Sequence, residues 1–190
     1  EFRRVLFRSS RSINCSFYSG LYQVRSLAMY KTLVITFFSI IFLVQNSYAK
    51  VPIAGDPAPN FSLTSVAGNK ISLSDLKGKT VLVGMFHICV PCMKQALEFN
   101  KVRDQLSSEK LTILGINTSG DSKTSVMDYL NGFPEGVKFP YLLDPDQSVH
   151  KNYSQRDMPT VLVIDSEGVI QARVPWVGAD QLVKFLKKFL

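Results

Sequence analysis

Cysteine is scarce in this chain, with three in 190 residues: Cys15, Cys89 and Cys92. From Lys50 onward there are two, separated by two residues, so a long-range structural disulfide is not available there. A second Cys-x-x-Cys motif is also lacking, which argues against a four-ligand zinc site. Met93 follows Cys92 where c-type haem attachment needs a histidine, so haem attachment is excluded.

Most of the excess positive charge of the chain lies in the first 49 residues. The formal net charge is +7, from 22 basic and 15 acidic residues. Six of the basic residues and one acidic residue precede Lys50, so the remainder has 16 basic and 14 acidic residues, a net charge of +2. The chain from Lys50 onward therefore gives no electrostatic case for a nucleic-acid partner.

The longest apolar run near the start, residues 32–44, has 13 uncharged residues. A membrane-spanning helix needs about 20. Lys31 precedes the run, and Ser47 and Ala49 supply small residues at the end of a short polar segment. We expect residues 29–49 to be a signal peptide cleaved after Ala49, with export to the periplasm or another extracytoplasmic compartment. If it is not cleaved, the same segment is a membrane anchor.

Residues 1–28 are rich in Arg and Ser, begin with Glu-Phe and precede Met29. We interpret them as a non-native or overrun leader, expected to be disordered and outside the fold. Residues 50–190 have no internal repeat or low-complexity tract and are long enough for one domain with its own core.

The motif Cys89-Val90-Pro91-Cys92 lies between two patterned segments. Residues 80–86 form an apolar run typical of a buried strand, and residues 90–107 are predicted to form a helix. Pro91 is tolerated in its first turn, where backbone N–H groups are unpaired. Those N–H groups favour a thiolate on Cys89, and the thiolate is the nucleophile in disulfide chemistry. The placement therefore predicts a redox-active thiol pair.

A second β-rich run, residues 111–117, follows that helix, which predicts a parallel βαβ unit with a right-handed crossover. The remaining patterns predict two hairpins, one further strand and three more helices. The hairpins are predicted at residues 61–63 with 70–73 and at residues 160–164 with 169–174. The further strand is predicted at residues 139–144, and the helices at residues 122–130, 148–153 and 179–190. The predicted class is α/β, with a central mixed sheet flanked by helices.

This order, with the cysteine motif after the first central strand and Pro159 before the last hairpin, resembles the thioredoxin-like fold. More narrowly, it resembles the TlpA/ResA-like thiol–disulfide oxidoreductases of the redoxin group. The matching segments are residues 55–63, 71–79, 89–92, 158–160 and 162–168. The resemblance implies an N-terminal β-hairpin and a helix–strand insertion between Gly120 and Asp144.

The resemblance also implies roles for individual residues. Cys89 matches the attacking cysteine and Cys92 the resolving cysteine. Pro159 matches the cis-proline beside the disulfide, which is chemically plausible because cis peptide bonds are costly except before proline. Met158 and Pro91 are expected to contact the substrate.

Some positions depart from the family pattern. Gln95 stands where many members have a glutamate, and Leu97 where a proline is common. The missing carboxylate removes an expected proton acceptor. His87, two residues before Cys89, is a possible modulator, since it could stabilise the thiolate when protonated or take a proton when neutral. The alternative is a loop histidine without a role.

Two other polar residues are expected to be solvated and not part of the site. His150 falls in the short polar helix predicted over residues 148–153, and Glu98 lies six residues after Cys92.

The function favoured by these observations is reduction of protein disulfides by dithiol–disulfide exchange through Cys89 and Cys92. Pro91 beside Cys92 resembles the dipeptides of reducing members, which favours reduction over oxidation. The implied partners are disulfide-containing or dithiol client proteins and a membrane-bound or soluble thiol electron donor. We expect a monomer with no cofactor and no metal.

Two alternatives remain at this point. A peroxidase of the peroxiredoxin type shares the redoxin scaffold, but that family has a threonine three residues before its reactive cysteine, and here the residue is Phe86. A Cu(I)-binding redox chaperone is the other, because thiolates are soft ligands and His87 is close in sequence to both cysteines. Peroxide consumption would favour the first, and preference for Cu(I) over disulfide substrates the second.

Overall fold

A computed structural model describes residues 50–106 and 109–190. The expectations for the leader at residues 1–28, for the signal peptide at residues 29–49 and for Cys15 lie outside the described residues. Within the described ranges, no helix has both the length and the apolar character needed to cross a membrane.

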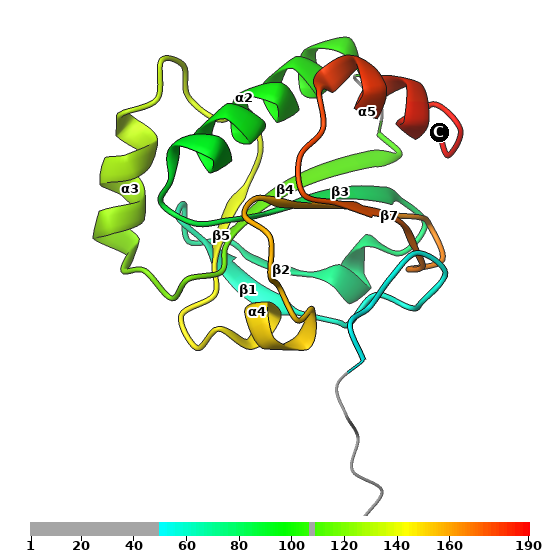
Figure 1. Ribbon diagram of the computed structural model, residues 1–190, viewed down its shortest axis with the longest axis horizontal. Coiled ribbons are helices and arrows are strands. Elements are labelled where there is room, and N and C mark those ends of the chain that lie inside the picture. Colours follow the sequence, from blue (N-terminus) through cyan, green and yellow to red (C-terminus); the bar gives the residue numbers. More distant parts are fainter. Residues whose placement is uncertain (1–49, 107–108) are drawn as a thin grey trace, which may run out of the picture. The chain divides into compact units, whose positions relative to one another are not determined.

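The described chain is built on a seven-stranded mixed sheet in the order β2-β1-β5-β4-β3-β6-β7 (Figure 1). The central strands β3, β4 and β5 run parallel, and the other pairings are antiparallel. This confirms the predicted α/β class with a mixed sheet. The strands are β1 Ser62–Ser65, β2 Lys70–Ser72, β3 Thr80–Phe86, β4 Leu111–Asn117, β5 Tyr141–Leu143, β6 Thr160–Ile164 and β7 Ile170–Val174.

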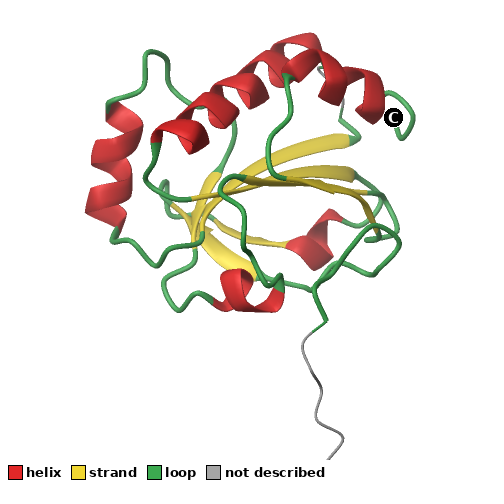
Figure 2. Cartoon of the chain, in the orientation of Figure 1, coloured by secondary structure: helices red, strands yellow, loops and turns green. Residues whose placement is uncertain are grey.

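Helices cover both faces of the sheet (Figures 1 and 2). Two of them, α2 Val90–Gln105 and α5 Ala179–Leu186, pack on one face, and η1 Leu73–Leu76 and α4 Ser148–Asn152 lie on the other. The remaining helix, α3 Lys123–Asn131, precedes β5, and together they form the insertion implied by the resemblance. The N-terminal hairpin of β1 and β2 is also present, as expected.

Two helical segments differ from the expectation. Leu73 was expected to end the second strand of the first hairpin, but that strand ends at Ser72 and Leu73 begins the 3₁₀ helix η1. The last helix ends at Leu186 and not at residue 190, because the following N–H groups of Lys188 and Phe189 bond to carbonyls three residues back. Such bonds tighten the last turn of a helix. The hydroxyl of Thr80 donates to the carbonyl of Phe189 at 3.1 Å, which holds this turn against the start of β3.

Strand β3 carries the chain through the core to the cysteine motif. All seven of its residues are buried, because hydrophobic layers cover both of its faces. The side chains of Leu82 and Phe86 join the layer beneath α2, whereas Val83 and Met85 join the layer beneath α4. A Cβ atom at Gly84 would lie 2.1 Å from Cζ of Phe86, so a glycine there lets the Phe86 ring lie back over the strand.

Glu98 connects α2 to α5, and the expectation of a solvated side chain was wrong. The N-cap residue of α5, Gly178, has no side chain to cap the helix. Instead Oε2 of Glu98 accepts the N–H of Ala179 at 2.7 Å, and Oε1 accepts a hydrogen bond from Lys101 at 2.6 Å. Only 19% of the Glu98 side chain is exposed. Burial alone would raise the pKa of Glu98, but these two hydrogen bonds outweigh it and hold the pKa below its ordinary value.

We expect Glu98→Ala to lower the free energy of unfolding by about 1 kcal/mol at pH 7, as for loss of a helix cap. Because the folded-state pKa is lowered, the stabilisation is present above the unfolded pKa of Glu98 and is lost as pH falls through the folded value. Urea unfolding at pH 7 and pH 3 measures both effects. Glu167→Ala, which removes an exposed carboxylate, is the control. Equal losses in the two variants at pH 7 would contradict the capping role.

Candidate active site

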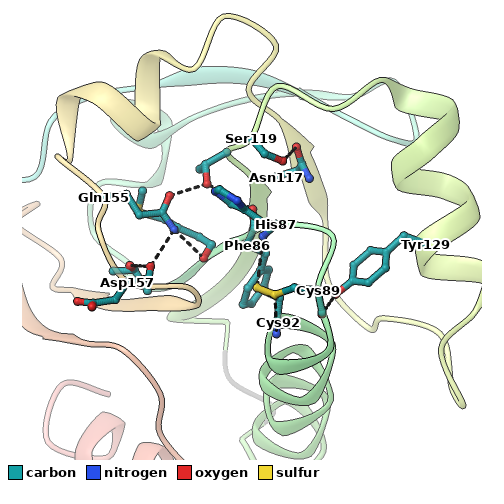
Figure 3. The surroundings of a disulfide bond; sticks show 12 residues. Phe86, His87, Cys89, Cys92, Asn117, Ser119, Tyr129, Gln155 and Asp157 are labelled. Atoms are coloured by element: carbon teal, nitrogen blue, oxygen red, sulfur yellow. Dashed lines mark hydrogen bonds between the residues drawn. A yellow bond between two sulfur atoms is a disulfide. The ribbon is translucent and has the colours of Figure 1, made fainter.

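Cys89 and Cys92 form a disulfide at the start of α2, with their Cα atoms 5.3 Å apart (Figure 3). Cys89 is the N-cap residue in an extended conformation, and its sulfur accepts the N–H of Cys92 at 3.3 Å. Cys92 is 1% exposed, whereas Cys89 is partly exposed. One sulfur is therefore accessible at a helix N-terminus and the other is shielded inside the first turn.

The local sequence explains why the helix begins at this motif. Pro91 lies in the first turn of α2, where its missing N–H costs no hydrogen bond and its fixed φ suits a helix. Val90 and Pro91 are exposed between the two cysteines, with Val90 58% exposed. The motif thus presents an apolar surface on both sides of Cys89, since Ile88 is 42% exposed as well.

The backbone of His87 contacts the buried sulfur, because its N–H donates to Sγ of Cys92 at 3.3 Å. Its imidazole lies toward α4, where the ring centroid of His150 is 6.1 Å away. His150 is partly buried and its Nδ1 is inaccessible, so the expectation of a solvated residue was wrong. Burial, and then the neighbouring His150, lower the pKa of His87, while Asp121 acts in the opposite direction.

The Met158–Pro159 peptide bond is cis, in agreement with the resemblance. Thr160 pairs with Met85 in the antiparallel register of β6 and β3, so Pro159 is at the end of the sheet from which the chain continues to Cys89. Pro159 is buried and the side chain of Met158 is 49% exposed.

A buried polar network fixes the loops around this edge of the sheet (Figure 3). The side-chain oxygen of Gln155 accepts from the Thr118 hydroxyl at 2.5 Å, and its amide nitrogen donates to the carbonyls of Met85 and Asp157, each at 3.2 Å. Thr118 also donates its backbone N–H to the carbonyl of Phe86 at 3.0 Å. Sequence reasoning missed these residues. A usable signal was that Thr118 directly follows a parallel strand, where functional loops gather.

Tyr129 of α3 was also missed. Its hydroxyl donates to the carbonyl of Cys89 at 2.6 Å, and its ring packs edge-on against Phe133 with centroids 4.8 Å apart. Burial raises the pKa of Tyr129 despite its hydrogen bonding, so the hydroxyl keeps its proton and remains a donor. The insertion therefore contacts Cys89 directly, and nothing in the local sequence pattern of α3 indicated this.

Gln95 is not free to act in catalysis. It is fully buried, its amide nitrogen donates to the carbonyl of Val177 at 2.8 Å, and its oxygen accepts the N–H of Val177 at 2.9 Å. Both polar atoms are therefore used to hold the loop before α5. Phe86, also fully buried, stacks on Tyr141, packs at a tilt against Phe99 and directs no hydroxyl toward Cys89.

The described part of the chain has no group of three or more His, Cys, Asp or Glu side chains arranged to hold a metal ion. What the arrangement supplies is an accessible sulfur at a helix N-terminus, a buried partner sulfur, and exposed apolar residues around them. These are the requirements for reversible exchange between this disulfide and the thiols of another molecule.

The chain matches the Redoxin family model over residues 53–175. It is 32% identical over 149 residues to the thiol-disulfide oxidoreductase ResA of Bacillus subtilis, which covers 78% of this chain and 79% of ResA. It is 31% identical over 136 residues to ResA of Bacillus anthracis, covering 70% of this chain and 77% of that protein.

Solved structures are similar in the same region. The thioredoxin domain of a thiol-disulfide oxidoreductase from Bacteroides vulgatus superposes with a TM-score of 0.60 at 26% identity, covering 72% of this chain and 96% of that one. StoA of Bacillus subtilis gives 0.58 at 23% identity, covering 67% and 96%, and supports the fold alone. The chain belongs to the redoxin family and is a ResA-like thiol–disulfide oxidoreductase with a thioredoxin-like fold.

Proposed function

We propose that this enzyme is exported and reduces disulfides of client proteins, with Cys89 as the nucleophile and Cys92 as the resolving thiol. The observation that carries the proposal is the asymmetry of the pair, since Cys92 is 1% exposed and Cys89 is partly exposed at the N-cap of α2. Only the accessible sulfur can reach a disulfide in another protein.

The exchange has two steps. The Cys89 thiolate attacks one sulfur of the client disulfide, the client S–S bond breaks, and a client thiolate leaves. The Cys92 thiolate then attacks Sγ of Cys89, which breaks the mixed disulfide and releases the second client thiolate. Two electrons pass from the enzyme to the client, and the enzyme is left with the Cys89–Cys92 disulfide.

The reducing direction is proposed from Pro91, whose place beside Cys92 resembles reducing members of the family. A reductase must itself be reduced again, so a membrane-bound or soluble thiol donor is the second partner. Export is proposed from the signal-like pattern of residues 29–49, which places the enzyme in the periplasm or another extracytoplasmic compartment.

Clients are proposed to dock on the apolar residues around the disulfide, Ile88, Val90, Pro91 and Met158. The backbone of Met158, next to Pro159, is suited to pair with an extended client segment as an added strand. A peroxidase is less well supported, because Phe86 is buried in an aromatic cluster and supplies no hydroxyl near Cys89.

Turnover of insulin disulfides by the reduced full-length chain tests the function, with Cys15→Ser as background to remove the third thiol. In that background we expect Cys92→Ser to accumulate a mixed disulfide with oxidised insulin, because the resolving thiol is absent. Cys89→Ser should trap at least about tenfold less, because Cys92 is shielded. Mass spectrometry before and after dithiothreitol measures the adduct. Equal trapping would overturn the assigned roles.

We expect Met158→Asp to slow insulin reduction roughly tenfold, because docking would bury an unpaired carboxylate. Reaction with the small reductant dithiothreitol should be unchanged, since it needs no docking surface. Ile53→Asp is the matched control, because Ile53 is 52% exposed and belongs to the segment in which Gly55 donates to Ile170. Ile170 pairs with Ile164, at the opposite end of β6 from Thr160. Equal slowing by both variants would contradict the docking surface.

We expect Tyr129→Phe to raise the pKa of Cys89 and slow its alkylation at neutral pH. The substitution removes the hydrogen bond to the Cys89 carbonyl, which positions Cys89, and keeps the aromatic ring. Tyr153→Phe is the matched control, since Tyr153 also donates to a backbone carbonyl, that of Pro59, at 2.7 Å. Each variant should lose about 1 kcal/mol of stability. Alkylation rates between pH 5 and 9 measure the effect, and identical profiles for the two variants would refute a positioning role for Tyr129.

A further inference from the structure

Two imidazoles meet at the loop that links β3 to α2. His87 follows β3 and His150 lies in α4, and their ring centroids are 6.1 Å apart at an angle of 44°. Nε2 of His87 and Nδ1 of His150 are both buried and have no hydrogen-bond partner within the described residues. Buried polar atoms are nearly always paired, so each unpaired nitrogen calls for an explanation.

The pair is linked to the reacting sulfur through the backbone. His87 donates its N–H to Sγ of Cys92, so a charge on this sulfur lies next to the residue that carries one of the imidazoles. Because the surroundings are buried, the interaction between a thiolate and an imidazolium there is screened less than at the surface.

The proposed redox cycle needs a group near Cys92 that can accept the proton of its thiol. Cys92 must lose its proton before it can attack the mixed disulfide, and its 1% exposure leaves almost no contact with solvent. Gln95 cannot take the proton, because it is an amide with both polar atoms bonded to Val177. The two histidines are the only ones in the chain, and both lie here.

We propose that His87 and His150 form one proton-holding site that compensates the charge of the Cys92 thiolate during resolution. The thiol proton of Cys92 ends on this imidazole pair, and the thiolate attacks Sγ of Cys89. The bond between Cys89 and the client then breaks, and the pair returns its proton to the departing client thiolate or to solvent. Electrons move only between sulfur atoms.

The surrounding charges are consistent with one proton on the pair. Burial and the second imidazole both lower the pKa of His87, so two protons together are unfavourable, while Asp121 favours one. Most other charged groups on the adjoining elements either have hydrogen-bond partners of their own or are exposed. Asp144 accepts the N–H groups of Val149 and His150, and Lys151 donates to the carbonyl of Asp146. Arg173 donates to the carbonyls of Tyr153 and Ser154, while Asp157 and Lys94 are exposed. The charge that changes during the cycle is on Cys92.

The direct test is an NMR titration of the full-length Cys15→Ser chain, whose two histidines give two imidazole signals that His150→Phe assigns. In the oxidised protein the pKa of His87 should be below 6.5. Reduction with dithiothreitol should raise it by about one unit, a tenfold change in proton affinity. In reduced Cys92→Ser the increase should be absent. A pKa of His87 that is the same in oxidised and reduced protein would overturn the proposal.

The kinetic test follows release of insulin from a preformed mixed disulfide on Cys89 at pH 6. The double variant His87→Phe/His150→Phe should release it about tenfold more slowly, while the initial attack by Cys89 is unchanged. Lys151→Gln, which removes a charge from the same helix, is the control and should release at the normal rate. Unchanged release by the double variant would overturn the proposal.

This inference rests on the proposed function, but the titration uses no client. If the pKa of His87 responds to reduction and insulin is not reduced, the reductase proposal fails and the proton site stands. If insulin is reduced and the pKa does not respond, the proton site fails alone.

Discussion

The rest of the site depends on the junction at which β3 ends and α2 begins. The strand is buried on both faces, so its end is fixed, and the helix starts within three residues of it. Cys89 is the N-cap and Cys92 lies in the first turn, which places the two sulfurs in different environments within a single helical turn. The difference in exposure between the two cysteines follows from this geometry.

Neutral hydrogen bonds hold that junction in place from several elements. Tyr129 bonds to Cys89 from the insertion, Gln95 fixes the loop before α5, and Gln155 joins the end of β3 to the loop that contains Met158. None of these side chains carries a charge. A thiolate that forms here therefore meets dipoles oriented by the fold and, in the proposed cycle, a single proton on His87 and His150.

The sequence was sufficient for the features that follow from local patterns. The buried strand β3, the helix that begins at the Cys-x-x-Cys motif and the parallel pairing of β3 with β4 were predicted correctly, because periodicity and chain order determine them. The helix–strand insertion was implied by the family resemblance and is also present. The limits of helices were less accurate. The last turn after Leu186 depends on a contact between Phe189 and Thr80, more than 100 residues apart in the chain, which no local pattern contains.

The errors at the site have a shared physical cause. Glu98 and His150 were taken as solvated because each is polar and lies on a helix, yet both face a neighbouring element: α5 for Glu98, and the loop after β3 for His150. The side chain of a polar residue on a helix can face either solvent or a neighbouring element, and only the packing of the helix decides which. These tertiary contacts also bring the imidazoles of His87 and His150 together, and the backbone N–H of His87 bonds to the buried sulfur of Cys92, so in the proposed cycle they decide where a proton can be held.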